Sequence, residues 1–445
     1  MLYIAGLLCF TLSILVSIGL HELGHLFFAK KFGTLVTDYS IGFGKKIWSR
    51  KHNETTYNLR ILPLGGFIKI AGMFPPVETN PEKSLKTTTG RTGSRFTQFN
   101  HRIRKTEHEK LNNIPQERMF YALTWWKKFI IMIAGPTVNL IISFLLLSSV
   151  YGIVGQSNYV VPENKPIVST VAKCAVGKFG KSADTCAKEN YSPAYAAGLK
   201  INDRVITFNN EKMTNWDVFV KRFQKLKTGE VFHITVERNG SMVDLEGSMR
   251  TFVRPSEENK NENIRMGFMG VSPKFHKEYK KLSPFETLGL MEQSVVEVGK
   301  KLGTLPGKVY NAALAIVGLE ERDPHGPVSV LGGARYSGEI YSYDNPQKLL
   351  NTKDKVSSFF VLVAGFNLFI GVLNLVPLLP LDGGYMIASL WEGLKRLWAR
   401  FRKREVDPVD IAKLMPLSYG VSFAFAIMGI ILITADIVAP LYLFH

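Results

Sequence analysis

The stretch VSIGLHELGHLFFAK, residues 16–30, places two histidines and a glutamate inside an apolar segment. The apolar run extends back to the first residue and is long enough to cross a bilayer, which takes about 20 residues. An ionisable side chain in hydrocarbon costs several kcal/mol unless it has a partner or a function. His21, Glu22 and His25 are therefore candidates for a functional site inside a membrane.

Four apolar stretches of the 445-residue chain have the length of a membrane span. They cover residues 1–28, 127–155, 356–379 and 417–443. The first has no basic region before it and no convincing small-residue cleavage site, so we interpret it as a retained span rather than a signal peptide. The expected fold class is a polytopic α-helical membrane protein with four transmembrane helices.

Basic residues, which give the chain a net charge of +18, are concentrated between spans. Segments 29–126 and 380–416 both hold clusters of lysine and arginine, which places both in the cytoplasm by the positive-inside rule. We expect segment 380–416 to be a cytoplasmic loop. The segment between spans two and three, and both termini, are then extracytoplasmic. Nucleic-acid binding is not supported, because the basic residues flank spans and no recognition motif accompanies them.

His21 and His25 are four residues apart, so on a helix they lie on one face, one turn apart. Glu22 can reach a metal-bound water without itself being a ligand, as in the H-E-x-x-H pattern of zinc peptidases. A catalytic zinc takes three protein ligands and keeps one position open. The alternative is a chance match with satisfied core histidines, which the cost of burying them in an apolar span disfavours.

Asp382 is the candidate third ligand. It follows the apolar run of the third span, and spans one and three both run from outside to inside, so it lies at the same cytoplasmic depth as the histidines. Pro377 and Pro380 interrupt the helix before it, and Gly383 and Gly384 allow close backbone approach. The alternative, an ordinary loop aspartate, does not explain the shared depth.

These motifs together resemble the site-2 protease family. The resemblance covers nearly the whole chain and is strongest to bacterial members with four spans and one extracytoplasmic PDZ domain. It rests on His21–His25, Ala134–Pro136 with Asn139, Gly326–Arg335, Asn374, Pro377 and Leu381–Gly383. One departure is Tyr385, where many bacterial members have a histidine; we do not count this position as a ligand.

The resemblance implies a zinc metalloendopeptidase in a bacterial cell membrane that cuts single-span membrane proteins. Substrates of the anti-sigma-factor type would first be trimmed by an extracytoplasmic protease. One Zn²⁺ would be held by His21, His25 and Asp382, with Glu22 as the general base. Asn374, and less clearly Asn139, would hold the substrate backbone or the oxyanion.

Residues 160–255 are expected to form a small extracytoplasmic α+β domain. Its strands alternate, Asn239-Gly240 is a hairpin signal, and Ser192–Met213 resembles the PDZ domains of bacterial proteases. Such domains bind extended peptides by strand addition. We favour a second role, the exclusion of untrimmed substrates, and a domain that binds nothing is the remaining alternative.

Cys174 and Cys186 both fall on the extracytoplasmic side, where a disulfide can persist. We predict that they are joined; two free thiols are the alternative. The other soluble parts are less informative. Residues 256–355 are expected to be a linker with juxtamembrane helices, and residues 79–118 a flexible polar insertion of unassigned role.

Residues 56–72 are apolar but too short and too interrupted to span a membrane. We predict a hairpin of Asn58–Leu62 and Phe67–Ile70 around a Pro-Leu-Gly-Gly turn, dipping into the membrane beside the zinc. Its free edge would bind an unwound substrate through Phe67, Ile68, Lys69 and Ile70. The alternative is a packed hairpin that never meets substrate.

Two other functional classes compete with the protease. A metal transporter would also carry intramembrane histidine and aspartate, but it needs neither Glu22 nor a peptide-binding domain. A catalytically silent scaffold could present a PDZ domain, but it would not need a complete set of ligands together with Glu22.

Overall fold

The computed structural model describes residues 2–75, 114–161, 166–176, 181–183, 186–255, 263–343, 351–402 and 409–441. The chain divides into two compact units. Unit 1 comprises Met1–Gly155 and Lys281–His445, and unit 2 comprises Gln156–Lys280.

Unit 1 contains four helices that are long and apolar enough to cross a membrane, among the described residues. They are α1 (Leu2–Lys31), α4 (Trp125–Ile153), α9 (Thr352–Asn374) and α11 (Met415–Val438), the last preceded by the short helix η4 (Ile411–Leu414). These helices match the four predicted spans. The third helix, α9, ends at Asn374 rather than at the predicted residue 379. Asp382 begins a separate helix, α10 (Asp382–Arg402).

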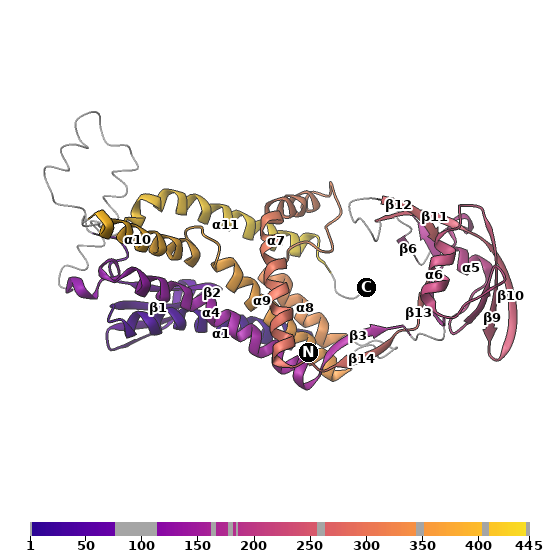
Figure 1. The fold of residues 1–445 in the computed structure, drawn as a ribbon, viewed down its shortest axis with the longest axis horizontal. Helices are drawn as coiled ribbons and strands as arrows, with labels where there is room; N and C mark the ends of the chain where they lie inside the picture. The colour runs from indigo at the N-terminus through magenta and orange to yellow at the C-terminus, as the bar shows by residue number, and fades with distance from the viewer. Residues whose placement is uncertain are drawn as a thin grey trace, which may run out of the picture. The chain divides into compact units, whose positions relative to one another are not determined.

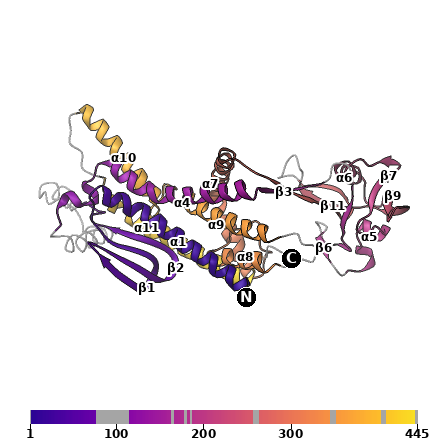
Figure 2. The ribbon, with the colours of Figure 1, turned by 90° about the horizontal axis from the view of Figure 1, so that it is seen from below.

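Helices α1, α4 and α9 pack against one another, and α8 (Val330–Ser342) packs along α1 (Figures 1 and 2). Small residues bring α8 and α1 close: Ser337 Oγ donates to the Gly6 carbonyl at 2.8 Å, and a Cβ at Gly6 would meet the Ser337 backbone. Residues 330–342 are polar enough to resemble a soluble segment. Their close contact with α1 through small residues makes them part of the helical bundle.

Helix α11 is held near its C-terminal end by a buried ion pair. Arg322 donates to Asp436 at 2.5 Å, and the Ser329 backbone N–H donates to the other carboxylate oxygen at 2.7 Å. A buried charge needs such partners to offset its lost hydration. These contacts tie α11 to the segment that leads into α8.

Helix α7 (Pro284–Ile316) begins with a capping box, in which Ser283 and Glu286 satisfy each other's backbone N–H groups. Its apolar stripe includes Met291, Val295 and Val298. The stripe packs on α9 and α4, next to Leu368 and Val372. Its apolar spacing therefore reflects packing within unit 1.

The predicted hairpin over residues 56–72 is wrong in its turn and its pairing. Strand β1 (Val36–His52) pairs with β2 (Thr55–Ile70), and the turn lies at Asn53–Glu54. Both predicted arms, 58–62 and 67–70, belong to β2 and do not pair with each other. The long β1 strand was missed because its outer half is charged and does not alternate clearly.

The two strands fold so that the first part of β1 has partners on both sides. Tyr39 lies opposite Tyr57 on one side and opposite Ile68 on the other. Residues 66–70 therefore form an edge of this sheet, which lies beside α1 (Figure 2). The Tyr39 hydroxyl donates to the Gly19 carbonyl of α1 at 2.6 Å and fixes the sheet on that helix.

The segment 380–416, predicted as a loop, contains the helix α10 (Asp382–Arg402). It is amphipathic, and its exposed apolar side chains include Trp391, Trp398 and Phe401. Most of the predicted insertion 79–118 lies outside the described residues. Its end forms the short helix η1 (Gln116–Arg118), followed by η2 (Phe120–Ala122), where Phe120 is buried.

Unit 2, residues 156–280, is wider than the predicted 160–255 because later strands pair with earlier ones: β13 (Val271–Pro273) pairs with β4 (Val168–Val171), and β14 (His276–Lys280) with β3 (Gln156–Val160). Its main sheet follows the order β10-β9-β7-β8. The strands span Ser241–Ser248, Val231–Arg238, Arg204–Phe208 and Glu211–Lys212. A further hairpin pairs β11 (Arg250–Pro255) with β12 (Asn263–Phe268).

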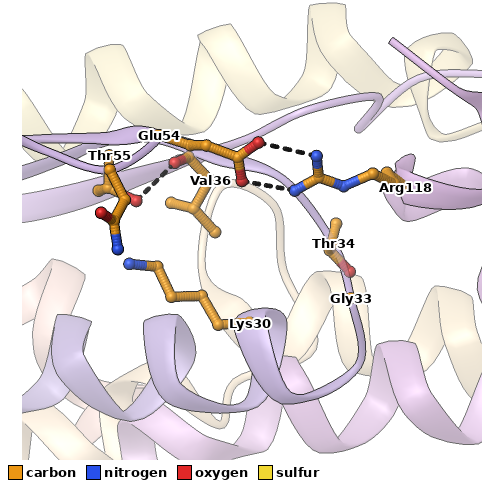
Figure 3. A pocket seen from close by; sticks show the side chains of 8 residues that line it. Lys30, Gly33, Thr34, Val36, Glu54, Thr55 and Arg118 are labelled. Atoms are coloured by element: carbon orange, nitrogen blue, oxygen red, sulfur yellow. Dashed lines mark hydrogen bonds and ion pairs between the residues drawn. The ribbon is translucent and has the colours of Figure 1, made fainter.

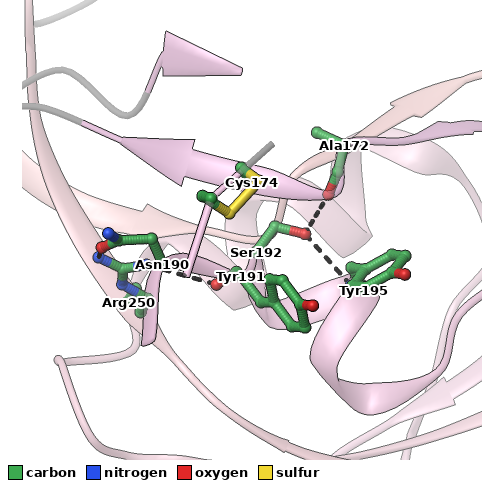
Figure 4. Close-up of a disulfide and its surroundings, with 8 residues drawn as sticks. Ala172, Cys174, Asn190, Tyr191, Ser192, Tyr195 and Arg250 are labelled. Atoms are coloured by element: carbon green, nitrogen blue, oxygen red, sulfur yellow. Dashed lines mark hydrogen bonds between the residues drawn. A yellow bond between two sulfur atoms is a disulfide. The ribbon is translucent and has the colours of Figure 1, made fainter. Parts of the chain in front are cut away.

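The core of unit 2 is formed by the sheet and helix α6 (Trp216–Gln224), with Phe219, Phe232 and Val236 fully buried. The predicted disulfide between Cys174 and Cys186 is present (Figure 4). Cys174 opens strand β5 (Cys174–Val176), which pairs with β6 (Lys181–Ala183). Nearby, Ser192 caps helix α5 (Pro193–Ala197) and donates to the Ala172 carbonyl.

Candidate metal centre

His21 and His25 point their Nε2 atoms at one place from a single face of α1. The two nitrogens are 3.2 Å apart, and both residues are buried, with exposures of 7% and 4%. The spacing of four residues accounts for this, since one helical turn separates the side chains. Two imidazole nitrogens so close need a shared proton or a shared cation between them.

Asp382 places a third candidate ligand atom beside the two histidines. Its Oδ2 lies 3.2 Å from His21 Nε2 and 3.3 Å from His25 Nε2. In a tetrahedral zinc site with bonds of about 2.0–2.1 Å, neighbouring ligand atoms are about 3.3 Å apart. The three edges of this triangle have that length, so the residues present fit a zinc ion with one position left open.

The chain reaches this arrangement through a short turn between α9 and α10. Pro377 and Pro380 follow the end of that helix, and Asp382 is the first residue of α10. The turn is tight: a Cβ at Gly383 would overlap the Val376 carbonyl, and one at Gly384 would lie 2.7 Å from the Leu379 nitrogen. Both glycines therefore have a packing reason to lack a side chain.

Helix α4 passes directly behind the histidines. A Cβ at Gly135 would overlap His25 Nε2 and would lie 2.7 Å from His21 Nε2. The His25 Nδ1 atom lies 2.7 Å from the Ile131 carbonyl oxygen, a contact that orients the ring. Sequence reasoning noted Gly135 as part of a motif but gave it no role; a glycine in an apolar helix is the signal that could have suggested close packing.

Glu22 is buried, with 8% exposure, and close enough to His21, His25 and Asp382 to interact with all three electrostatically. The backbone N–H of Ile68, on the edge of the β1–β2 sheet, donates to its carboxylate. A Cβ at Gly66 would lie 2.8 Å from Glu22 Cγ. The sheet edge and the glutamate are therefore in direct contact.

The four proposed substrate-binding residues Phe67–Ile70 lie along this edge, opposite residues 36–40 of β1. Because Ile68 directs its N–H to Glu22, its neighbours Phe67 and Lys69 direct theirs to β1, as alternate residues do in an antiparallel ladder. Ile70 is buried in a cluster with Leu26 and Ile131. The structure thus places one of these four N–H groups, that of Ile68, at the glutamate.

Asn139 lies one turn beyond Gly135 on α4 and is buried, with 1% exposure. Among the described residues, neither its amide nitrogen nor its amide oxygen has a hydrogen-bond partner. A buried amide without partners is costly, and its position suits a ligand in the site. Asn374 is the last residue of α9 and is half-buried. Tyr385 packs in the cluster with Leu26 and Phe120.

A pocket separate from the metal centre lies at the C-terminal end of α1, between Lys30, Thr34 and the β1–β2 turn (Figure 3). Arg118 donates two hydrogen bonds to Glu54 across it, at 2.8 and 2.6 Å. This bidentate contact holds the pKa of the Glu54 carboxyl below its usual range. The side chains of this pair are largely exposed.

Comparison with known proteins assigns the chain to a protein family. The model of peptidase family M50 matches residues 9–415. The chain belongs to peptidase family M50. It is 28% identical to zinc metalloprotease Rip1 of Mycobacterium tuberculosis, with all of both chains covered. It is 24% identical to the regulator of sigma-W protease RasP of Bacillus subtilis, with 84% of this chain and 87% of that protein covered.

Zinc metalloprotease RasP of Geobacillus kaustophilus is similar to the same extent, at 26% identity over 84% of this chain. As a member of family M50 with four spanning helices, the chain is a multi-pass membrane protein and a zinc metalloendopeptidase of the site-2 type. The expected enzyme class and cofactor are confirmed.

Proposed function

We propose that this M50 peptidase cuts single-span membrane proteins of the anti-sigma-factor type within the membrane, after another protease has trimmed them outside. The observation that supports it most is the triangle of His21, His25 and Asp382, with edges of 3.2–3.3 Å, inside an apolar helix bundle. The relative in Bacillus subtilis is named as a regulator of sigma-W protease, which indicates the substrate class.

In this proposal His21, His25 and Asp382 hold the zinc ion. Zinc, when bound, supplies a Lewis acid for the scissile carbonyl and lowers the pKa of a water toward about 7. Glu22 takes the proton from that water and delivers it to the leaving amine. Its burial and its contact with Ile68 hold the carboxylate at the ligand triangle rather than in solvent.

A transmembrane substrate helix must unwind before its peptide bonds are accessible, and its freed N–H and C=O groups then need partners. The edge formed by residues 66–70 offers backbone groups beside Glu22, so we assign it to substrate binding by strand addition. The buried, unpartnered Asn139 and the helix-end Asn374 are the side chains we assign to the substrate backbone or the oxyanion.

Topology and regulation follow from the same proposal. The positive-inside rule places residues 29–126 and 380–416 in the cytoplasm, and unit 2 with both termini outside. Unit 2 would act as the PDZ domain that excludes untrimmed substrates. The disulfide between Cys174 and Cys186 agrees with that side, because disulfides persist in oxidising compartments.

The test is cleavage in cells. The chain, wild type or Glu22→Gln, is co-expressed with a tagged single-span anti-sigma factor truncated on its outer side. We expect a cytoplasmic fragment with wild type and none with Glu22→Gln, while both purified proteins contain zinc. The full-length substrate serves as the control and should stay intact.

The same experiment separates the alternatives. Equal fragment yields from both forms would remove Glu22 from the reaction. Zinc-loaded protein that yields no fragment in either form would instead favour a transporter or a silent scaffold. Glu22 lies within electrostatic reach of the ligand triangle and against the sheet edge, and this favours the protease because neither alternative requires it.

A further inference from the structure

The helix α10, which begins with the proposed ligand Asp382, also carries a buried carboxylate that the mechanism does not use. Glu392 has a side-chain exposure of 2%, and its Oε2 accepts a hydrogen bond from Lys128 Nζ at 2.7 Å. The Lys128 side chain is itself 5% exposed. Arg396 donates to the other oxygen at 2.7 Å, from one turn further along α10.

Such a buried ion pair is not explained by stability alone. The desolvation of two charges roughly cancels their attraction, so apolar or neutral replacements are often as stable. A pair of this kind favours one relative position of the two elements that carry it, because Lys128 loses its carboxylate partner, and Glu392 one of its two cationic partners, when the elements separate.

The two elements joined here are α10 and α4. Lys128 lies in the first turn of α4. Next to this ion pair, Gly393 of α10 packs closely on Trp125 of α4: a Cβ at Gly393 would lie 2.6 Å from the Trp125 ring. Tyr385 and Met386, in the first turn of α10, pack in the cluster that includes Ile131 and Met132 of α4. Helix α10 is therefore docked on α4 along its first three turns.

Helix α4 also positions the histidines. Its Ile131 carbonyl orients His25, and Gly135 lies against both Nε2 atoms. Lys128, Ile131 and Gly135 are spaced three and four residues apart, so they share one face of α4. One helix face thus contacts the two histidines directly and holds, through Glu392, the helix that bears the aspartate.

We propose that Lys128 and Glu392 are positioning residues for the metal site: their buried ion pair locks α10 to α4 so that Asp382 stands at a fixed distance from His21 and His25. This proposal rests on the ligand set proposed above. In this proposal α4 sets the relative positions of ligands that come from α1 and α10, two helices far apart in the sequence.

The test measures zinc retention by the full-length protein in detergent. Lys128→Met/Glu392→Gln removes both charges together, so that neither is left buried alone. Glu54→Gln is the matched control, since it removes one carboxylate from the largely exposed pair with Arg118 on the same unit. Zinc release to an excess of chelator and thermal unfolding of the zinc-free form are recorded for each.

We expect the double variant to release zinc on the order of 10- to 100-fold faster than wild type, as for other residues that orient metal ligands. Its zinc-free unfolding midpoint should stay within a few degrees of wild type, and Glu54→Gln should release zinc at the wild-type rate. A folded double variant that releases zinc at the wild-type rate overturns the proposal.

Two further variants make the result decisive. If the double variant does not fold, Glu392→Asp decides: it keeps the charge but shortens the link by one methylene, so faster zinc release supports positioning and a wild-type rate overturns it. Asp382→Asn is measured alongside. Wild-type retention in Asp382→Asn overturns the ligand set itself, whereas fast release there with wild-type retention in the double variant overturns the positioning role alone.

Discussion

The Nδ1 atom of His25 lies 2.7 Å from the carbonyl oxygen of Ile131, on the helix that passes behind both histidines. A carbonyl accepts only, so Nδ1 carries the proton and Nε2 keeps its lone pair free for a metal. The contact therefore selects the tautomer that can act as a ligand. It also makes α4 part of the site, although α4 supplies none of the three ligand atoms.

Replacing Gly135 by alanine should expel zinc. The added methyl group would overlap His25 Nε2 and approach His21 Nε2 to 2.7 Å, so the rings must turn away or α4 must shift. Glycine to alanine inside a helix otherwise favours folding by about 1 kcal/mol. We expect a folded protein with less than about a tenth of wild-type zinc affinity, within the range for disturbed ligand orientation; metal analysis after dialysis measures it.

Gly152→Ala is the control for this variant, because it lies on the same helix and an added Cβ would meet nothing closer than 3.9 Å. It should bind zinc as wild type does. Normal zinc content in Gly135→Ala would mean that the histidine rings lie further from α4 than the structure places them.

Asp382→Asn should weaken zinc binding, because a neutral amide replaces an anionic ligand at a largely buried site. Two histidines alone leave the ion without its third protein ligand. The zinc content of purified protein, measured by mass spectrometry of the metal, checks this. Full occupancy together with unchanged turnover would remove Asp382 from the ligand set.

Ile68→Pro should abolish cleavage while zinc content and folding are retained. Proline removes the one N–H that the edge of the β1–β2 sheet directs at Glu22, and leaves the ladder with β1 intact. Cleavage of the co-expressed substrate is the measurement. Ile68→Ala keeps the N–H and should cleave normally.

Lys69→Pro is expected to behave differently from Ile68→Pro. Its N–H faces β1, opposite Asp38, so the substitution should disrupt the sheet and lower the yield of folded protein. If Ile68→Pro cleaves as wild type does, the edge does not bind substrate through this group. If both variants fail to fold, substrate binding by this edge of the sheet is not supported.

Removing the disulfide should destabilise unit 2 by about 2–3 kcal/mol, the range for a short closed loop. The variant is Cys174→Ala/Cys186→Ala, and chemical unfolding of the full chain is the measurement. Cys9→Ala is the control, since Cys9 is an exposed free cysteine in α1 and its loss should change nothing. Alkylation of Cys174 and Cys186 without prior reduction would contradict the pairing.

Much of the site could be predicted from local sequence. The positions of His21 and His25 on one face follow from helical periodicity, and the need for Glu22 follows from the chemistry of the motif. Asp382 could be placed at the same depth because hydropathy and the distribution of basic residues set the direction of each span. These inferences use the short-range geometry of a helix and the bilayer, and both are encoded locally.

The sheet beside α1 shows where local sequence fails. Residues 58–62 and 67–70 were predicted to pair with each other, but both pair with β1, whose charged outer half gives no alternating pattern. Strand pairing depends on residues that are distant in the sequence and on how the sheet packs against α1. The helix α10 was likewise missed, because basic residues in a loop-like segment conceal an apolar face.

The sequence by itself predicted four membrane spans and placed a histidine pair and a glutamate on neighbouring turns of the first span, because hydrophobic length and helical spacing are local properties. Only the tertiary structure decided which helix lies against the candidate ligands. Gly135, the Ile131 carbonyl and the Lys128–Glu392 pair act through contacts between residues more than 100 positions apart. Such contacts arise when helices pack, and no single segment encodes them.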